Sequence, residues 1–327
     1  MSSRRAAAVV RLSSLGDVLL AAHVPSFLVR ADPARRVLFV TKERYADLLR
    51  GHPHVSRVIT MREDEGLDPV IQALRGEDIG EIVDLHGNWR SMRLLASFPG
   101  VPRRLAPKDA LRRRLWVYAR WLHPAPVPPL LRTYRALSGV NPDAELTPWL
   151  RLTLSDGERE AGLTRVPRSA RAQGFVLLGA GARWLTKRWP AAHFASLAER
   201  LERERGIRSV IAVEPGEEIP PELPAALQIP FRELAAVASH ALAIVSNDSA
   251  VLHLGPALGV PAVGIFGGTV PELGFARQGP RDEAVGIELG CRPCGVHGRA
   301  RCPLGHHACM RDLEPSVVLQ TLGRALA

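Results

Sequence analysis

Short apolar runs alternate with amphipathic segments along the first hundred residues of the chain. An apolar run bounded by turn formers predicts a buried strand, and apolar residues at helical spacing predict a helix. Strands and helices that alternate in this way predict a parallel sheet with right-handed crossovers. The predicted strands are residues 6–12, 37–41, 55–60 and 81–85, and the helical segments between them are residues 18–28, 43–50, 69–75 and 88–97.

A second alternating set follows a stretch that is rich in proline and turn formers, residues 123–170, in which residues 130–137 read as a helix. The end of this stretch serves as a linker, so we expect an N-terminal domain of residues 1–165 and a C-terminal domain of residues 166–327. The second set predicts strands at residues 175–179, 209–213, 243–246, 262–266 and 284–289, with helices at residues 191–204, 231–240 and 249–258.

Length and composition agree with two domains. The 327 residues exceed a typical single core, and the 46% of apolar residues can fill two. Aromatic residues make up 5%, so the cores must consist mostly of alanine, valine and leucine. The fold class is therefore α/β, with a ligand cleft at the carboxyl ends of the strands.

The first polar cluster comes directly after the first predicted strand, in the segment Ser13-Ser14-Leu15-Gly16-Asp17. Asp17 opens the next helix and can simply cap it. Its place at the carboxyl edge of the sheet also suits a general base that takes a proton from a hydroxyl. No Gly-x-Gly-x-x-Gly follows this strand, which argues against a dinucleotide enzyme.

The second cluster follows the first strand of the second set, in residues 179–190. Its small residues let backbone N–H groups approach a phosphate, Thr186 can donate a hydroxyl, and Lys187 supplies a positive charge for a diphosphate. The spacing is not that of a Walker A loop. A strand–helix turn with solvated basic residues is the alternative interpretation.

The third cluster lies where the strand 243–246 ends. Asp248 or Ser249 caps the following helix, and the first N–H groups of that helix, including that of Ala250, are then free to bind a ligand. His253 lies about one turn further, on the same side. The loop Gly267-Gly268-Thr269 after the next strand adds polar groups to this edge of the sheet.

The chain carries 43 basic and 33 acidic residues, a net charge of +10, which favours an anionic partner: nucleic acid, acidic lipid or a phosphorylated substrate. One segment concentrates this charge and interleaves it with Trp116 and Trp121. It predicts an interfacial helix on anionic lipid, or a surface that binds acidic sugars of an acceptor. The basic residues are Arg103, Arg104, Lys108, Arg112, Arg113, Arg114 and Arg120.

All four cysteines lie in one segment near the C-terminus, and the rest of the chain has none. This distribution argues against a disulfide scaffold for the whole chain. Cys291 and Cys294 form a Cys-x-x-Cys pair, and Cys302 and Cys309 follow. Four thiols at these spacings suit a structural zinc site, although the second pair is not Cys-x-x-Cys. Reduced, partly buried thiols and disulfides remain the alternatives.

Four of these segments, taken in order, resemble glycosyltransferase family 9, the ADP-heptose:lipopolysaccharide heptosyltransferases. The cysteine segment, residues 291–309, is most similar to the heptosyltransferase II branch. The resemblance extends over essentially the whole chain. The segments are Arg-Leu-Ser-Ser-Leu-Gly-Asp at 11–17, Thr-Lys-Arg-Trp-Pro at 186–190, Asp-Ser-Ala-Val-Leu-His at 248–253 and Ile-Phe-Gly-Gly-Thr at 265–269.

The resemblance implies a GT-B fold, with two facing Rossmann-like domains and the donor held by the C-terminal one. It implies an inverting transfer of heptose from ADP-heptose to a lipopolysaccharide inner-core acceptor, with no cofactor for catalysis, while a structural zinc is suggested by the cysteine spacing alone. Asp17 is then the base. The implied donor-binding residues are Thr186, Lys187, Glu217, Glu218, Asp248, Ser249, Ala250 and His253, with Glu214 as a less favoured alternative for the ribose.

The N-terminal sequence has no long apolar core, so we expect no signal peptide. We expect a monomer in the cytoplasm, peripheral on the inner membrane, that binds no nucleic acid. Two other functions stay open at this point: a sugar-nucleotide epimerase or other transferase of the same fold, and, because of the net charge of +10, a nucleic-acid-binding protein.

Overall fold

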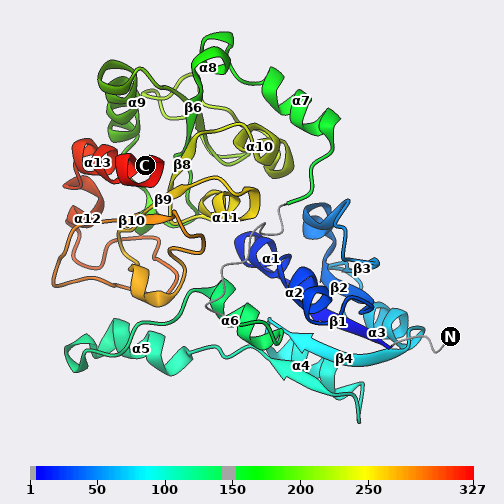
Figure 1. Ribbon diagram of the computed structural model, residues 1–327. Coiled ribbons are helices and arrows are strands. Elements are labelled where there is room, and N and C mark those ends of the chain that lie inside the picture. Colours follow the sequence, from blue (N-terminus) through cyan, green and yellow to red (C-terminus); the bar gives the residue numbers. More distant parts are fainter. Residues whose placement is uncertain (1–4, 142–151) are drawn as a thin grey trace. The chain divides into compact units, whose positions relative to one another are not determined.

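A computed structural model describes residues 5–141 and 152–327 (Figure 1). The chain divides into two compact units, Met1–Lys108 with Leu130–Thr153, and Asp109–Pro129 with Leu154–Ala327. This division differs from the expected boundary near residue 165. Helix α7 (Asp156–Thr164) belongs to the second unit because it packs against α10 (Phe231–Ala238), where Arg232 forms an ion pair with Glu158.

The first unit contains a parallel sheet of five strands in the order β3-β2-β1-β4-β5. The chain leaves the central strand β1 toward β2 on one side and later returns to pair β4 on the other. The strand order therefore reverses between β1 and β4, which is the position where such sheets bind ligands. The strands are β1 (Ala6–Val10), β2 (Val37–Lys42), β3 (Arg57–Met61), β4 (Ile79–Asp84) and β5 (Arg103–Leu105).

Helices cover both faces of this sheet. Apolar side chains of α3 (Asp68–Arg75) and α4 (Trp89–Ala96) form one core with alternate residues of β1. The other face carries α1 (Leu15–Ala21), α2 (Val24–Ala31) and α6 (Leu130–Leu137), as predicted for residues 130–137. The expected helix at 18–28 is thus two helices, and residues 43–50 form the 3₁₀ helix η1 (Glu43–Leu49).

The second unit repeats the pattern with a parallel sheet in the order β10-β9-β8-β6-β7. Here the order reverses between β6 and β8. The predicted strands of this half are present with small shifts at their ends, except that the strand predicted at 284–289 already ends at Val285. They are β6 (Phe175–Gly179), β7 (Arg208–Ala212), β8 (Ala243–Asn247), β9 (Ala262–Ile265) and β10 (Glu283–Val285).

In Figure 1, α9 (Ala191–Arg205) and α13 (Pro315–Leu326) lie together on one side of this sheet. Phe194 and Leu197 of α9 and Val318 of α13 pack in one core with Val176 of β6. The other side carries α10 and α11 (Leu254–Leu258), which follows the 3₁₀ helix η4 (Ala250–His253). Short helices complete the unit: α8 (Arg168–Gln173), η3 (Leu185–Lys187), η5 (Pro271–Leu273) and α12 (Ala308–Arg311).

The basic segment 103–121 is not one helix, which corrects the expectation for this region. Arg103 and Arg104 lie in the edge strand β5 of the first unit, and the second unit begins with α5 (Ala110–Tyr118) and η2 (Arg120–Leu122). The strand forms because residues 103–105 pair in parallel with β4. Among the residues that the structure describes, no helix has the length and apolarity needed to span a bilayer.

Candidate active site

An ion pair occupies the position where the strand order of the second sheet reverses. Lys187 follows β6 and Asp248 follows β8, and their charged groups lie 2.7 Å apart. Thr269, which follows β9, donates its hydroxyl to the same carboxylate at 2.7 Å. Three loops that are separate in sequence thus place three polar side chains at one edge of the sheet.

Asp248 stays ionised although it is buried. Burial opposes the charge, but the ammonium of Lys187, with hydrogen bonds from Lys187 and Thr269, outweighs this cost and lowers the pKa of Asp248. Lys187 itself is 13% exposed. An ammonium has three N–H donors, so one can remain on Asp248 while the others turn to an anionic ligand.

Asn247 ties the loops after β6 and β8 together. Its side-chain amide donates to the carbonyl of Ala180 at 2.8 Å and accepts the backbone N–H of Trp189 at 3.1 Å. Because the side chain is fully buried, both contacts are shielded from water. The loop that carries Lys187 is therefore held at both of its ends.

The hydroxyl of Thr186 is used inside the protein. Thr186 is 1% exposed, and its Oγ1 donates to the carbonyl oxygen of Arg299 at 3.1 Å and accepts the backbone N–H of Arg299 at 2.7 Å. A hydroxyl carries one donor hydrogen, and here that hydrogen is donated to the carbonyl oxygen of Arg299. Thr186 thus joins the Lys187 loop to the cysteine segment.

The predicted cap cluster after β8 is present. Ser249 is the N-cap of η4 and accepts the backbone N–H of Val251 at 3.3 Å. Ala250 begins η4, and His253 is buried at its end. The structure therefore brings Asp248, Ser249, Ala250 and His253 into one small region beside Lys187.

The acidic segment after β7 lies against the glycine loop after β6. A Cβ on Gly181 would approach the Glu217 carboxylate to 2.9 Å and the backbone nitrogen of Glu214 to 3.0 Å, so glycine is needed for this close packing. Glu217 forms an ion pair with Arg188 at 2.5 Å, and Glu218 is exposed. Burial and the nearby charge of Glu217 raise the pKa of Glu214.

Asp17 lies at the corresponding position of the first sheet, directly after β1. It occupies the third position of α1, where its Oδ2 accepts the backbone N–H and the hydroxyl of Ser14 at 3.1 and 2.8 Å. Arg11 contacts the same oxygen at 2.7 Å. These three contacts all use Oδ2 and not Oδ1.

Arg11 controls the charge of Asp17. Burial opposes ionisation, but the Arg11 guanidinium and the hydrogen bonds from Ser14 prevail and lower the pKa of Asp17. Arg11 is itself held by the carbonyls of Ser13 and Leu85. Nearby, burial and the charge of Arg11 lower the pKa of His86 to about 4, so this imidazole is neutral at pH 7.

The basic residues predicted to contact acceptor or membrane are divided between the two units. Arg104 forms an ion pair with the buried Glu81, and Arg113 lies 4.9 Å over the ring of Phe275, so both have structural partners. Arg103 and Lys108 are exposed in the first unit, whereas Arg112 and the exposed Arg114 lie in α5 of the second.

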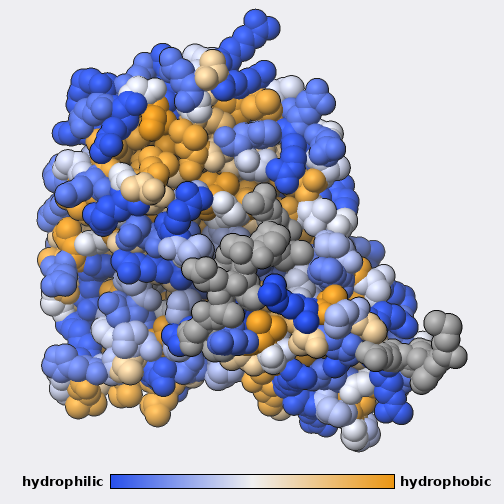
Figure 2. Space-filling model, in the orientation of Figure 1, coloured by the Kyte–Doolittle hydropathy of each residue, from blue (hydrophilic) through white to orange (hydrophobic). Residues whose placement is uncertain are grey.

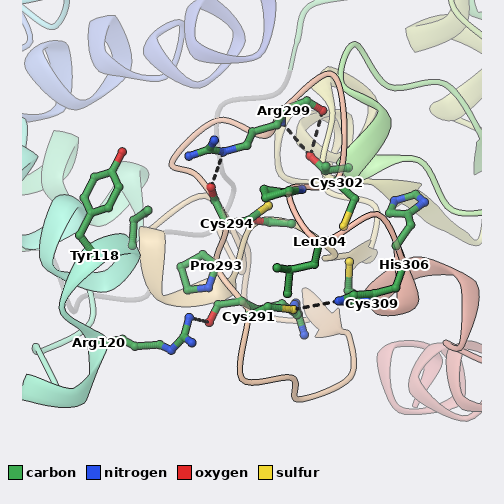
Figure 3. A pocket seen from close by; sticks show the side chains of 16 residues that line it. Tyr118, Arg120, Cys291, Pro293, Cys294, Arg299, Cys302, Leu304, His306 and Cys309 are labelled. Atoms are coloured by element: carbon green, nitrogen blue, oxygen red, sulfur yellow. Dashed lines mark hydrogen bonds between the residues drawn. The ribbon is translucent and has the colours of Figure 1, made fainter.

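The four cysteines line one pocket of about 310 Å³ in the second unit (Figure 3). All four are unpaired thiols. Burial raises the pKa of Cys309 to about 11. Within the described part of the chain, no three His, Cys, Asp or Glu side chains are close enough together to share a metal ion as they stand.

Two residues of these sites were not predicted from the sequence. Arg11 pairs with Asp17, and the available signal was an arginine directly after an apolar strand and six residues before the candidate base. Asn247 ends a buried strand, where a polar side chain needs partners, but nothing in the sequence names Ala180 and Trp189 as those partners.

Two Rossmann-like units, each with polar side chains at the reversal of its strand order, define the GT-B fold. The model of glycosyltransferase family 9 (heptosyltransferase) matches residues 69–303, more than half of the chain. The chain belongs to this family and is a glycosyltransferase. The α/β GT-B fold is confirmed, and the alternative of a nucleic-acid-binding protein is set aside.

Relatives and solved structures agree with this assignment. Lipopolysaccharide heptosyltransferase 1 of Pseudomonas aeruginosa is 27% identical over 324 residues, which cover 88% of this chain and 85% of the relative. Lipopolysaccharide heptosyltransferase 2 of Escherichia coli is 24% identical, covering 97% of each. The structure of ADP-heptose lipopolysaccharide heptosyltransferase II of E. coli has a TM-score of 0.70 at 18% identity, covering 98% of each chain.

A family 9 glycosyltransferase from Veillonella parvula has a TM-score of 0.75 at 16% identity, covering 98% of this chain and 97% of the other. At such low identity the likeness concerns the fold. It shows that both units, and not one of them alone, follow the architecture of the family.

Proposed function

We propose that the protein transfers a heptose from ADP-heptose to an inner-core acceptor of lipopolysaccharide, with inversion at the sugar carbon and without a catalytic metal. The relatives that carry heptosyltransferase names and cover most of the chain support the substrate class. The observation that carries the proposal is the Lys187–Asp248 pair at the reversal of the second sheet, where an ADP diphosphate would bind.

The transfer requires one base and one group that stabilises the leaving diphosphate. An acceptor hydroxyl oxygen bonds to the anomeric carbon of the heptose, and its proton passes to Oδ1 of Asp17. The bond between that carbon and the diphosphate oxygen breaks, and ADP leaves with the electron pair. A single displacement of this kind inverts the configuration at the carbon.

The charge that develops on the leaving ADP needs a nearby cation. The ammonium of Lys187 supplies it, and Asp248 and Thr269 hold the lysine in place before the donor arrives. Thr186 acts as the residue that fixes this loop, since its hydroxyl is bonded to Arg299. Of the acidic residues, Glu217 and Glu218 remain our candidates for the ribose, with Glu214 as the third.

The test is donor binding followed by transfer. ADP should raise the thermal midpoint of the protein more than UDP or GDP, because a ligand that binds only the folded state stabilises it. Lys187→Ala should weaken ADP binding about 10- to 100-fold by calorimetry, as expected for a lost hydrogen bond between charged groups. Lys42→Ala is the matched control, since Lys42 forms an exposed ion pair with Glu63 in the first unit.

Two results would contradict the proposal: ADP affinity unchanged in Lys187→Ala, or no transfer of heptose from ADP-heptose to a heptose-deficient inner-core acceptor by the wild-type enzyme. Metal independence has its own measurement. The rate of transfer should not depend on whether Mg²⁺ or Mn²⁺ is added or omitted, and a strict requirement for either ion would refute this part.

We further propose that the enzyme works at the inner membrane and rests on it through α5 and η2. These elements expose large apolar side chains, and Figure 2 shows apolar surface at the lower left, where Figure 1 places α5. Arginines of the same segment suit an anionic lipid surface. The exposed apolar side chains are Leu111 (72%), Tyr118 (67%), Trp121 (70%) and Leu122 (61%).

A further inference from the structure

The pocket lined by the four cysteines contains potential metal ligands that the transfer chemistry does not use. Much of its wall comes from the segment between β10 and α12, which contains no further helix or strand, and residues of α5 and η2 with Thr186 and Gly268 complete it. Cys309 lies at the start of α12 and is buried, and the other three thiols are partly buried. As they stand, these thiols are not close enough together to share an ion, so binding of an ion requires part of residues 286–307, which form no helix or strand, to move.

The contacts of His306 place its imidazole as a neighbour of a thiol. Its Nδ1 accepts the backbone N–H of Ala308 at 2.9 Å, so the ring hydrogen resides on Nε2. Nε2 lies 3.8 Å from the sulfur of Cys291, where it donates toward the thiol (Figure 3). Metal-bound sulfur commonly receives such outer hydrogen bonds.

Cys302 begins a tight turn on the wall of the same pocket. The carbonyl of Cys302 accepts the N–H of Gly305 at 3.1 Å, which closes the turn Cys302-Pro303-Leu304-Gly305. Arg120, Arg292 and Arg299 line the same pocket and can balance the negative charge that four thiolates leave on a divalent ion.

The cysteine segment is bonded directly to the loop that carries Lys187. Arg299 binds both the hydroxyl and the backbone N–H of Thr186. Cys294 donates its N–H to the carbonyl of Gly268 at 3.0 Å, and Gly268 donates its own to Thr186 at 2.8 Å. A Cβ on Gly268 would lie 2.8 Å from Thr186 and 2.9 Å from the Cys294 sulfur, so these groups meet at one point.

We propose that Cys291, Cys294, Cys302 and Cys309 bind one zinc ion, and that this zinc holds the loop of Thr186 and Lys187 in the shape that binds the donor diphosphate. Four sulfur ligands in tetrahedral geometry are typical of zinc in a structural site. The coupling to the donor rests on the proposed role of Lys187, whereas zinc binding itself does not.

Zinc content is the first measurement. Protein purified under reducing conditions without chelator should contain about one equivalent of zinc, as structural sites bind tightly. Cys302→Ser should lose it, while Arg301→Ser, an exposed change in the same segment, should keep it. Circular dichroism reports whether each variant folds. A folded wild type with four titratable thiols and no zinc, or with the cysteines in disulfides, overturns the site.

Calorimetry with ADP is the second measurement. Zinc-stripped wild type should bind ADP about 5- to 150-fold more weakly than zinc-loaded protein, the usual range of coupling between two sites. By reciprocity, ADP should tighten zinc binding by the same factor in a chelator competition. Equal ADP affinity in both states overturns the coupling. If zinc binds but neither state binds ADP, the donor assignment fails and the zinc site stands.

Discussion

At the residue scale, the two carboxylates nearest the proposed chemistry, those of Asp17 and Asp248, differ in their contacts and in their exposure. Asp17 keeps Oδ1 available while Arg11 and Ser14 hold Oδ2. Asp248 has a lysine and a threonine on one oxygen and is buried, so it orients Lys187 and is poorly placed for proton transfer. The division of roles follows from exposure and from the identity of the neighbouring cation.

Removal of the Asp17 carboxylate charge is the most direct test of the base. Asp17→Asn should lower the rate of transfer about 10²- to 10⁴-fold while ADP affinity stays near that of the wild type. Asp47→Asn, an exposed partner of Arg50 in the same unit, serves as the control. If the turnover of Asp17→Asn is near normal, Asp17 is a helix cap alone.

The pH dependence of the reaction should depend on Arg11. In the wild type the pKa of Asp17 is lowered, so the base is ionised, and kcat/KM should stay level as the pH falls toward the ordinary aspartate value of about 3.9. In Arg11→Gln, burial acts without the compensating charge, so the acid limb of the profile should move to higher pH. A profile with an unmoved acid limb in folded Arg11→Gln would assign the limb to another group.

At the element scale, the connection between α7 and α10 explains where the second unit begins. Arg232 is almost fully buried and binds Glu158 through two nitrogen–oxygen contacts of 2.6 and 3.0 Å. Glu158 also accepts hydrogen bonds from Ser155, the N-cap of α7. Sequence patterns do not reveal such a pair, because its members are 74 residues apart.

Glu158→Gln should therefore reduce stability in a pH-dependent way. The hydrogen bond from Arg232 is the main cause that lowers the pKa of Glu158 to about 2, against about 4.3 in the unfolded chain. The stabilisation is present above the unfolded value and is lost as the pH falls toward 2. Because the carboxylate is partly in solvent, we expect about 1–2 kcal/mol at pH 7.

Denaturant unfolding at pH 7 and at pH 3 measures this effect. The difference between wild type and Glu158→Gln should shrink at the lower pH, whereas Glu160→Gln on the same helix should change little at either pH. A pH-independent difference would show that the side-chain amide disturbs packing and that the charge is not what matters.

At the scale of the whole molecule, the net charge of +10 and the exposed apolar side chains of α5 and η2 combine to favour an anionic surface. Charge alone would give binding that salt removes completely. Apolar side chains add a contribution that salt does not screen, so the two kinds of contact can be separated by experiment.

Trp121→Ser should weaken sedimentation with anionic vesicles by several-fold, and added salt should weaken it further for both proteins. Trp89→Ser is a matched control, because Trp89 is also exposed (65%) but lies in the first unit. Equal binding to neutral vesicles, or equal loss in both variants, would speak against docking through η2.

The sequence by itself determined the α/β class, nearly all strands and the three polar clusters, because strand and helix periods are local properties of the chain. Parallel strands then had to bring their carboxyl ends to one edge, which places Lys187, Asp248 and Thr269 in the same region. The role of Arg11 as the partner of Asp17 was not predicted. The division of the basic segment into a strand and helices was not predicted either, since β5 is recognisable only through its pairing with β4.

Only the tertiary structure decided which side chains meet. Lys187 forms an ion pair with Asp248, which is 61 residues away in the sequence, and Thr186 is hydrogen-bonded to Arg299, which is 113 residues away. These contacts depend on the order of strands in the sheet and on how a segment without regular structure folds back against it. A periodic pattern carries no information about such pairings, because their free energy arises from burial and charge in the assembled fold.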